Sequence, residues 1–410
     1  MLRLGVSSGA FYPRIETEEV PAVATSYGFR DVELMVQTVG EYQPSFIREV
    51  RTRVDAAGCR VHGIHSFQTL HRFQTPYVRR KEEAYALFAL GIDATVALGG
   101  SVIVWHGFTK QDVAAPGGWD DFFRVTSQLS SMCAEAGVTL AIENVSWCAL
   151  NSVRDVLNLA ARLPELGPHG SIGFAFDPFQ AAEAGANPFM ILNAMEGAIV
   201  DVHLSDHQSG DEATRHLLPG DGALPWPALI RAIAATGYAG PMMIEGAIHN
   251  AETAARVVRL LDPLIADAIS EDDPCFGTPP AGVLEGIRLF NERKFYEAHE
   301  ELEHEWHAER RPLRKLYQGI LQIGVGFHHA RGGNHKGALL LLTDGIDKVS
   351  GFVPNCQGID TARLVRESQV CLDRIIELGA ANLSDFNWEF VPLVNVTSQT
   401  SQTIAWQFTC

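Results

Sequence analysis

The sequence predicts an α/β protein: an eight-stranded parallel (β/α)8 barrel followed by a small all-α helical bundle. Up to about residue 270, eight short apolar strand candidates alternate with amphipathic helical segments. Eight strand–helix units over that length match the repeat and size of a (β/α)8 barrel. Beyond about residue 280 the strand pattern stops and helical periodicity takes over. These two observations carry the predicted fold class.

The predicted strands are short runs rich in apolar and β-branched residues. We expect them at Leu2–Ser7, Asp31–Val36, Arg60–Phe67, Ser101–Gly107, Val138–Val145, Ser171–Asp177, Ile199–Ser205 and Pro241–Gly246. The clearest helical patterns between them are Pro44–Ala57, Arg79–Leu98, Trp119–Ala136, Val153–Leu163, Pro227–Ala235 and Ala251–Ile269. An open doubly wound sheet would also alternate in this way. However, the first strand runs into Ser7-Ser8-Gly9-Ala10, which lacks the glycine-rich phosphate turn typical of that fold.

The rest of the chain is organised differently. Residues 271–281 are acidic and then rich in proline and glycine, which predicts a linker after a barrel that covers residues 1–270. Residues 282–385 predict a bundle of four or five helices. Residues 386–410 are rich in Ser, Thr, Gln and Val and lack helical periodicity, so we expect an extended tail, either packed as a strap or partly disordered.

Composition and charge limit the function. Apolar residues make up 46% of the chain and charged residues 20%, which is typical of a soluble globular protein. The net charge of −17 disfavours partners that need clustered basic residues, so we expect neither nucleic acid nor membrane binding. The seven cysteines are widely spaced and form no C-x-x-C, which fits a reducing compartment rather than a disulfide framework. The N-terminus resembles a strand and not a signal peptide, so we expect a cytoplasmic protein.

Four side chains that can bind metals stand at the ends of four predicted strands: Glu143, Asp177, His203 and Glu245. In (β/α)8 barrels, chemistry collects at the C-terminal ends of the strands. Three carboxylates and one imidazole form an oxygen-rich site for Mn²⁺, Mg²⁺, Co²⁺ or Zn²⁺. A solvated polar rim would explain one such residue, but four of them on four strands favour a metal site.

The motifs around these residues resemble a known family. They are Ile142-Glu143-Asn144, Phe176-Asp177-Pro178, Val202-His203-Leu204-Ser205-Asp206, the run from His216 to Gly222 with the later Trp226, and Met243-Ile244-Glu245-Gly246. On these motifs, residues 1–270 resemble the xylose isomerase-like TIM barrel superfamily of sugar and sugar phosphate isomerases and epimerases. That superfamily also contains the endonuclease IV-type apurinic endonucleases.

The resemblance implies a mechanism and a class of substrate. In the epimerases, the four matching positions bind one divalent metal, and the first and last glutamates form an acid/base pair. Carried over, Glu143 and Glu245 would move a substrate C–H proton through a metal-bound enediolate. The expected partner is a small carbohydrate-like molecule, and a homo-oligomer is left open.

Further residues are candidates for substrate contact or for a second metal. His65 and His106 match positions that contact substrate in the isomerases and bind a further metal in the endonucleases. Gln180 and Thr214 stand where the endonucleases carry His and Asp ligands of a third metal. Their presence argues against phosphodiester cleavage. Whether Gln180 contacts the substrate stays open. Arg215 and His216 could bind a substrate phosphate or carboxylate. A pair of surface-loop residues explains them equally well.

The helical region carries a polar cluster of its own. Helical spacing places His299 and Glu303 on one helix face, and Gln318, Gln322 and His329 on another. If the two helices face each other, these five residues are buried together and must form hydrogen bonds with one another. We favour a structural hydrogen-bond network over a metal or small-ligand site, because glutamine is a poor metal ligand. The segment resembles the DUF309 family of unknown function through its Ala-His-Glu-x-x-Glu motif and its Gln-Gly-x-x-Gln helix, and that resemblance brings no chemistry with it.

The sequence therefore predicts a divalent-metal-dependent isomerase or epimerase fused to a helical bundle. Three alternatives stay open. The first is an apurinic endonuclease like endonuclease IV. The second is a metal-dependent hydrolase or lyase that uses the same residues, and the third is an inactive barrel that acts as a binding module.

Overall fold

The computed structural model describes residues 2–66, 72–208, 216–268, 275, 277–353 and 355–396. The chain divides into two compact units. The first comprises Met1–Trp226 and Thr236–Ala266, and the second comprises Pro227–Ala235 and Asp267–Cys410. Each unit has its own architecture.

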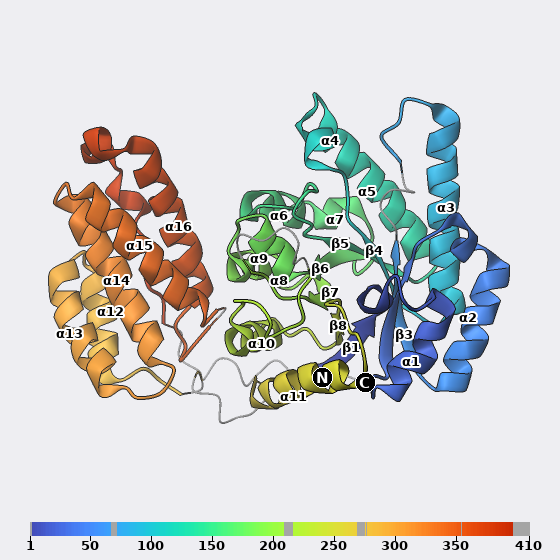
Figure 1. Ribbon diagram of the computed structural model, residues 1–410. Coiled ribbons are helices and arrows are strands. Elements are labelled where there is room, and N and C mark those ends of the chain that lie inside the picture. Colours follow the sequence, from blue (N-terminus) through green and yellow to red (C-terminus); the bar gives the residue numbers. More distant parts are fainter. Residues whose placement is uncertain are drawn as a thin grey trace, which may run out of the picture. The chain divides into compact units, whose positions relative to one another are not determined.

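The first unit contains a closed barrel of eight parallel strands (Figure 1). Each strand pairs with its neighbours in chain order, and the last strand closes the barrel by pairing with the first. This topology confirms the predicted fold class. The strands are β1 Arg3–Ser7, β2 Asp31–Val36, β3 Arg60–Ser66, β4 Val102–Trp105, β5 Thr139–Glu143, β6 Ile172–Phe176, β7 Ile199–Leu204 and β8 Pro241–Ile244.

Helices lie between the strands along the chain. They are α1 Val20–Ser26, α2 Pro44–Ala57, α3 Val78–Ala97, α4 Lys110–Ala114, α5 Gly118–Glu135, α6 Val153–Ala160, α7 Leu163–Leu166, α8 Pro178–Glu183, α9 Pro188–Ala194, α10 Trp226–Ala235 and α11 Ala251–Ala268. The predicted helix Val153–Leu163 is divided into α6 and α7, and Pro164 in the first turn of α7 fits a helix start. The short helices α1, α4, α8 and α9 were not predicted, because five to seven residues carry too little periodicity. Phe67 and Ile269, two predicted element ends, lie outside the described residues.

Two irregularities in strand pairing affect the interior of the barrel. Between β2 and β3, Val32 pairs with Val61 while Glu33 pairs with Gly63, so His62 is an extra residue on β3. Between β6 and β7, Phe174 pairs with Ile199 while Ala175 pairs with Asp201, so Val200 is an extra residue on β7. An extra residue in one strand re-aims the side chains beside it. Both irregularities lie on strands that carry buried histidines and carboxylates.

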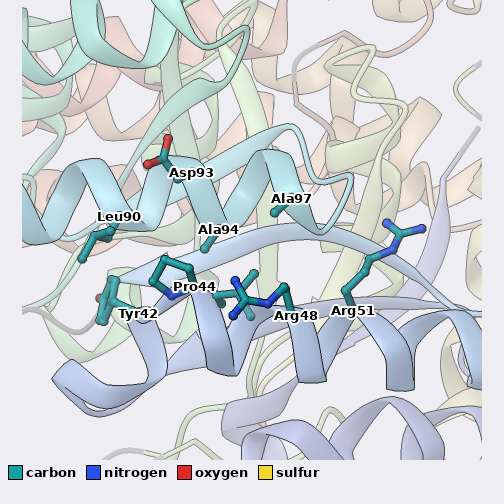
Figure 2. Close-up of a pocket in the computed structure, with 9 residues that line it drawn as sticks. Tyr42, Pro44, Arg48, Arg51, Leu90, Asp93, Ala94 and Ala97 are labelled. Carbon is teal, nitrogen blue, oxygen red and sulfur yellow. The ribbon is translucent and has the colours of Figure 1, made fainter.

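A cavity of about 260 Å³ separates parts of α2 and α3 on the outside of the barrel. Small side chains of α3, Ala94 and Ala97, face it, together with Tyr42 and Pro44 (Figure 2). Its charged lining residues are Arg48, Arg51 and Asp93. None of the lining residues belongs to the polar cluster at the strand ends that is described below.

The apolar stretch from Ala84 to Trp105 is divided between α3 and β4. Among the described residues, none of the helices combines the length and the apolar character needed to cross a membrane.

The second unit contains five consecutive helices, which confirm the predicted helical bundle. They are α12 Ala281–Asn291, α13 Phe295–Ala308, α14 Arg314–Arg331, α15 His335–Ser350 and α16 Thr361–Leu378. Each of them packs against the next along the chain. The helices α14 and α15 approach closely at Gly319, where an added Cβ atom would lie 2.7 Å from Cγ2 of Val349.

One disulfide departs from the sequence expectation. Cys275 and Cys356 are bonded across 81 residues of sequence and join the segment before α12 to the loop between α15 and α16. The expectation that the cysteines remain unpaired is therefore wrong for this pair, since spacing in the sequence does not show which distant residues the fold brings together. The free cysteines among the described residues, Cys59, Cys133, Cys148 and Cys371, are buried.

The beginning of the C-terminal tail packs on the second unit as a strap. The side chain of Asn291 exchanges two hydrogen bonds with the backbone of Val394, at 2.8 and 3.0 Å. The guanidinium group of Arg293 donates to the carbonyl oxygens of Val391 and Pro392. Trp388–Phe390 form a short 3-10 helix, and the contacts hold residues 391–394 against the end of α12. Residues 397–410 lie outside the described residues.

Candidate metal centre

The four predicted metal ligands lie together at the C-terminal ends of the strands. Glu143 is the last residue of β5, Asp177 directly follows β6, His203 belongs to β7, and Glu245 directly follows β8. All four are buried, and one ligand atom of each lies within 4.8 Å of the others. Four strand ends thus deliver three carboxylates and one imidazole to one small volume.

Local hydrogen bonds hold Asp177 in place. Asn144 and Asp177 exchange two hydrogen bonds of 2.8 Å, which tie the loop after β5 to the loop after β6. The Oδ1 atom of Asp177 accepts from the backbone N–H groups of Phe179 and Gln180 and so caps the first turn of α8. Its second oxygen, Oδ2, is buried without a hydrogen-bond partner. The motif residue Asn144 therefore helps to orient one candidate ligand.

Unpartnered carboxylate oxygens show that the donor atoms fit a cation. Oε2 of Glu143, Oδ2 of Asp177 and Oε1 of Glu245 are all buried, and none of them accepts a well-formed hydrogen bond from the described residues. Oε2 of Glu143 does lie 3.1 Å from Nε2 of His106, and Oε1 of Glu245 lies 3.5 Å from Nδ1 of His65. Burying a carboxylate oxygen without a partner is costly. A divalent cation would satisfy all three oxygens at once, because hard cations prefer oxygen ligands. These three side chains and His203 are the residues that would hold it.

The charges around the centre perturb its ionisable groups. Burial, together with the nearby charges of Glu143 and Glu245, raises the pKa of Asp177 well above its ordinary value. Burial also acts to raise the pKa of Glu143, but His203 and His106 outweigh it and lower that pKa well below the usual range. Without a cation, Asp177 would keep a proton, and a bound dication would replace this proton.

A second group of donors adjoins the first. Nε2 of His65 lies 2.7 Å from Nε2 of His106, and Nε2 of His106 lies 3.1 Å from Oε2 of Glu143. These three side chains also place one ligand atom each within 4.8 Å of the others. Burial would lower the pKa of His65, but hydrogen bonds to Glu245 and Glu33 raise it to about 10. The predicted residues His65 and His106 thus stand beside the metal centre and share Glu143 with it.

Sequence reasoning missed two buried members of this cluster. Glu33 of β2 is fully buried and contacts the rings of His65 and His203. Asp201 of β7 is also fully buried and lies 3.3 Å from Nε2 of His62. A signal was present for Glu33, because it is the one charged residue in the run Val32-Glu33-Leu34-Met35-Val36, where an apolar residue is expected in a buried strand.

Histidines are the cationic partners of this cluster. Within the described part of the chain, the ion pairs of Glu33, Glu143, Asp201 and Glu245 are all with histidines, and Asp177 has none. Four histidines face these five carboxylates, and Asp177, which has no ion pair among the described residues, is left for a proton or a metal. Buried charges need pairing or a metal, so the electrostatics of the cluster favour a bound cation.

The remaining predicted substrate-contacting residues are placed differently. The side-chain oxygen of Gln180 accepts from the backbone N–H of Ser146 and so braces the loop after β5. His216 adopts a positive φ of 53°, packs its ring 4.3 Å from that of Phe179, and places Nδ1 3.2 Å from Oγ of Ser205. Arg215 and Thr214 lie outside the described residues.

The motif after β7 is organised by one carboxylate, Asp206. This fully buried side chain accepts four hydrogen bonds. Its donors are the backbone N–H groups of His207, Gly220 and Leu224 and the indole Nε1–H of Trp226, at 2.7–3.0 Å. Asp206 therefore fixes both ends of the loop that follows the metal-ligand strand β7.

We expect Asp206→Asn to lower the free energy of unfolding of the barrel by about 3 kcal/mol, because an amide presents N–H groups to donors that need an acceptor. Chemical denaturation of the intact protein measures the change. Asp221→Asn is the matched control in the same loop, since Asp221 pairs with Arg256 at an exposed position, where an ion pair contributes less than about 1 kcal/mol. Equal losses in the two variants would contradict the assigned role of Asp206.

The polar residues of the helical unit are not gathered into one buried group. His299 and Glu303 on α13 approach to 4.0 Å, whereas Nδ1 of His329 contacts the side chain of Asn334. His299, Glu303, Gln318, Gln322 and His329 are all half-buried, and Oε1 of Gln322 lacks a hydrogen-bond partner. Among the described residues, the groups of three or more His, Cys, Asp or Glu side chains with metal-binding proximity all lie in the barrel.

Comparisons with known proteins agree with this division of the chain. Residues 21–264 match the family model described as xylose isomerase-like TIM barrel. Residues 283–341 match DUF309, a domain of unknown function. Both predicted resemblances are confirmed.

Two curated relatives match part of the chain. The uncharacterized protein y4fM of Sinorhizobium fredii (strain NBRC 101917 / NGR234) is 25% identical over 183 residues, which cover 43% of this chain and 57% of that protein. The rhizopine catabolism protein MocC of Rhizobium meliloti is 27% identical over 143 residues, which cover 31% of this chain and 42% of MocC. The chain thus spans about half the length of these relatives.

Solved structures resemble the chain in fold. A D-tagatose 3-epimerase-like protein aligns with a TM-score of 0.55 and 16% identity, over 65% of this chain and 100% of its own. An L-ribulose 3-epimerase aligns with a TM-score of 0.54 and 18% identity, over 65% and 96%. A D-allulose 3-epimerase from Methylomonas sp. aligns with a TM-score of 0.54 and 13% identity, over 64% and 98%. At these identities the likeness shows the fold alone.

Proposed function

Because the chain belongs to the xylose isomerase-like TIM barrel family, we propose that it is a divalent-metal-dependent isomerase or epimerase of a sugar or sugar phosphate. The observation that carries the proposal is the set of unpartnered, buried oxygens on Glu143, Asp177 and Glu245 beside His203. The epimerases among the similar structures support the class of substrate.

The donor set suits Mn²⁺, Mg²⁺, Co²⁺ or Zn²⁺. When bound, such a cation would supply Lewis-acid stabilisation of negative charge that develops on the substrate oxygens. The protein supplies the buried surroundings, in which the charges of the carboxylates act strongly. Asp177 and His203 hold the centre together in this scheme, and the two glutamates have a second task.

Glu143 and Glu245 form the proposed acid/base pair. Burial acts to raise the pKa of Glu245, but His203 and His65 outweigh it and lower that pKa. The pKa of Glu143 is lowered in the same way by His203 and His106. Both groups are therefore carboxylates at neutral pH, and each can accept a proton from a substrate carbon at the oxygen that does not face the cation. In an isomerisation, the glutamate that receives the proton returns it to the neighbouring carbon. In an epimerisation, the other glutamate takes a proton from solvent and delivers it to the opposite face of the same carbon.

The neighbouring residues are proposed to contact the substrate or to hold a second cation. His65 and His106 face Glu143, and the stoichiometry of bound metal decides between the two roles. Arg215 and His216 are proposed to bind a substrate phosphate or carboxylate, and Gln180 is proposed to support the mouth of the site through Ser146. Cytoplasmic location and assembly as a homo-oligomer stay predictions.

The proposed reaction is tested by incubating the metal-loaded protein with a panel of ketoses, aldoses and their phosphates in D₂O. We expect one class to exchange a C–H proton for deuterium and to yield an isomer or epimer in the NMR spectrum. A cleaved product without deuterium in the recovered substrate would favour a hydrolase or lyase. Nicking of abasic DNA would favour the endonuclease alternative. Failure of the whole panel, with no metal bound, would favour a binding module.

A further inference from the structure

We propose that Glu33 is a positioning residue that decides which ring nitrogen of His65 and of His203 faces the cation site. The inference rests on the cation site proposed above and concerns a residue outside the four ligands. Glu33 lies on β2 and is fully buried. A fully buried charged group needs hydrogen-bonding or charged partners that offset the free-energy cost of its burial.

The partners of Glu33 are two imidazole rings. Its Oε1 atom lies 3.2 Å from Nδ1 of His65, and its Oε2 atom lies 3.4 Å from Nε2 of His203. The two rings stand nearly parallel, with centroids 5.2 Å apart and an angle of 21°. One carboxylate thus spans two stacked histidines, and its Oε1 atom lies 3.2 Å from both Nδ1 of His65 and Nε2 of His203.

These contacts fix the tautomer of both rings. A carboxylate only accepts hydrogen bonds, so the nitrogen that faces it carries the proton. Nδ1 of His65 and Nε2 of His203 are therefore N–H groups. In the metal-free protein Nδ1 of His203 also faces a carboxylate and carries a proton. When a cation is bound, the nitrogen opposite Glu33 on each ring is the one left to offer a lone pair. Those opposite nitrogens face the donor groups: Nδ1 of His203 is 3.1 Å from Oε1 of Glu143, and Nε2 of His65 is 3.6 Å from Oε2 of Glu143. Glu33 hence aims both lone pairs toward the cation site.

A second carboxylate lies near the same ring and has a different role. Oδ2 of Asp201 is 3.4 Å from Nε2 of His203, but this oxygen accepts no hydrogen bond of acceptable geometry. Its other oxygen faces His62 and accepts from the backbone N–H of Val202. Asp201 therefore contributes charge at the same depth without orienting His203. This difference makes Asp201 a charge-matched control for Glu33.

The test compares Glu33→Gln with Asp201→Asn. A glutamine offers one acceptor and one donor group, so it can accept from only one ring, and the other ring must present a lone pair to the amide. That ring then carries its proton on the nitrogen needed by the cation. We expect the dissociation constant for Zn²⁺ to rise about 10- to 100-fold in Glu33→Gln, measured by competition with a chelating dye. Asp201→Asn should show a smaller rise.

The position of the ring protons gives a second readout. In the Zn²⁺-loaded wild type, ¹H–¹⁵N spectra of the histidine side chains should show His65 protonated at Nδ1 and His203 at Nε2, and Glu33→Gln should change at least one of them. If Zn²⁺ binding weakens equally in both variants, or if affinity and spectra are unchanged in Glu33→Gln, the proposed role of Glu33 is refuted. The cation site itself would still stand. Absence of Zn²⁺ binding by the wild type would overturn the cation site itself. Thermal melting of the metal-free variants confirms that they fold.

Discussion

Replacing Glu245 with glutamine is expected to slow hydrogen exchange at the substrate carbon about a thousandfold, because an amide cannot accept the proton that a carboxylate accepts. Glu245 is buried at the end of β8, and one of its oxygens has no hydrogen-bond partner among the described residues. Glu143→Gln should have a loss of similar size, since the proposed reaction needs both members of the pair. Deuterium incorporation from D₂O into the substrate measures the rate.

The control for this prediction must separate proton transfer from metal binding, since Glu245 serves both. Rates are therefore compared at saturating metal, with the bound metal measured in each variant. Glu252→Gln on α11 removes the same charge at an exposed position and should keep the wild-type rate. A Glu245→Gln protein that binds metal and still exchanges deuterium at the wild-type rate would contradict the assigned acid/base role.

Removal of the divalent cation is expected to abolish exchange and to destabilise the barrel. The cation offsets repulsion among buried carboxylates, of which Asp177 has no cationic partner among the described residues. At a free metal concentration of one hundred times the dissociation constant, binding stabilises the folded state by about 2.7 kcal/mol. For a unit of this size that corresponds to a rise in melting temperature of roughly 5–10 °C. Calorimetry with and without a chelator measures the shift.

Add-back of single cations then identifies the preferred metal. Mn²⁺, Mg²⁺, Co²⁺ and Zn²⁺ are each added to the chelator-treated protein, and both exchange activity and melting temperature are followed. The Asp177→Ala variant should lose most of the metal-dependent rise in melting temperature. It removes the candidate ligand whose Oδ2 atom has no hydrogen-bond partner among the described residues. If none of the four cations shifts the melting temperature of the wild-type protein, the metal centre is refuted.

The barrel could be predicted from the sequence because its signals are local. Each strand is a short apolar run, and a helical pattern follows most of them, so strand count and order did not depend on distant contacts. The gathering of four candidate ligands at the strand ends could be predicted for the same reason, since parallel strands of a barrel end on one face. The helix that was expected to run to Leu163 ends early because the chain starts a new helix at Leu163-Pro164.

Other features could not be predicted because they depend on which distant residues meet. Glu33 and His203 are separated by 170 residues but lie within hydrogen-bonding distance. An extra residue on β3 and another on β7 shift the pairing beside the site, and irregularities of this kind leave no clear mark on short, nearly continuous apolar runs. Cys275 and Cys356 are joined for a similar reason, through folding of the segment before α12 against the loop before α16.

The sequence by itself determined the barrel, the helical bundle and the four strand-end ligands, because hydrophobic periodicity and strand ends are properties of neighbouring residues. The tertiary structure alone decided which carboxylate oxygens have no partner, and that Glu33 spans His65 and His203. Those facts follow from closure of the barrel, which brings β2, β3, β5 and β7 around one buried volume. There the cost of burying charge makes each contact specific.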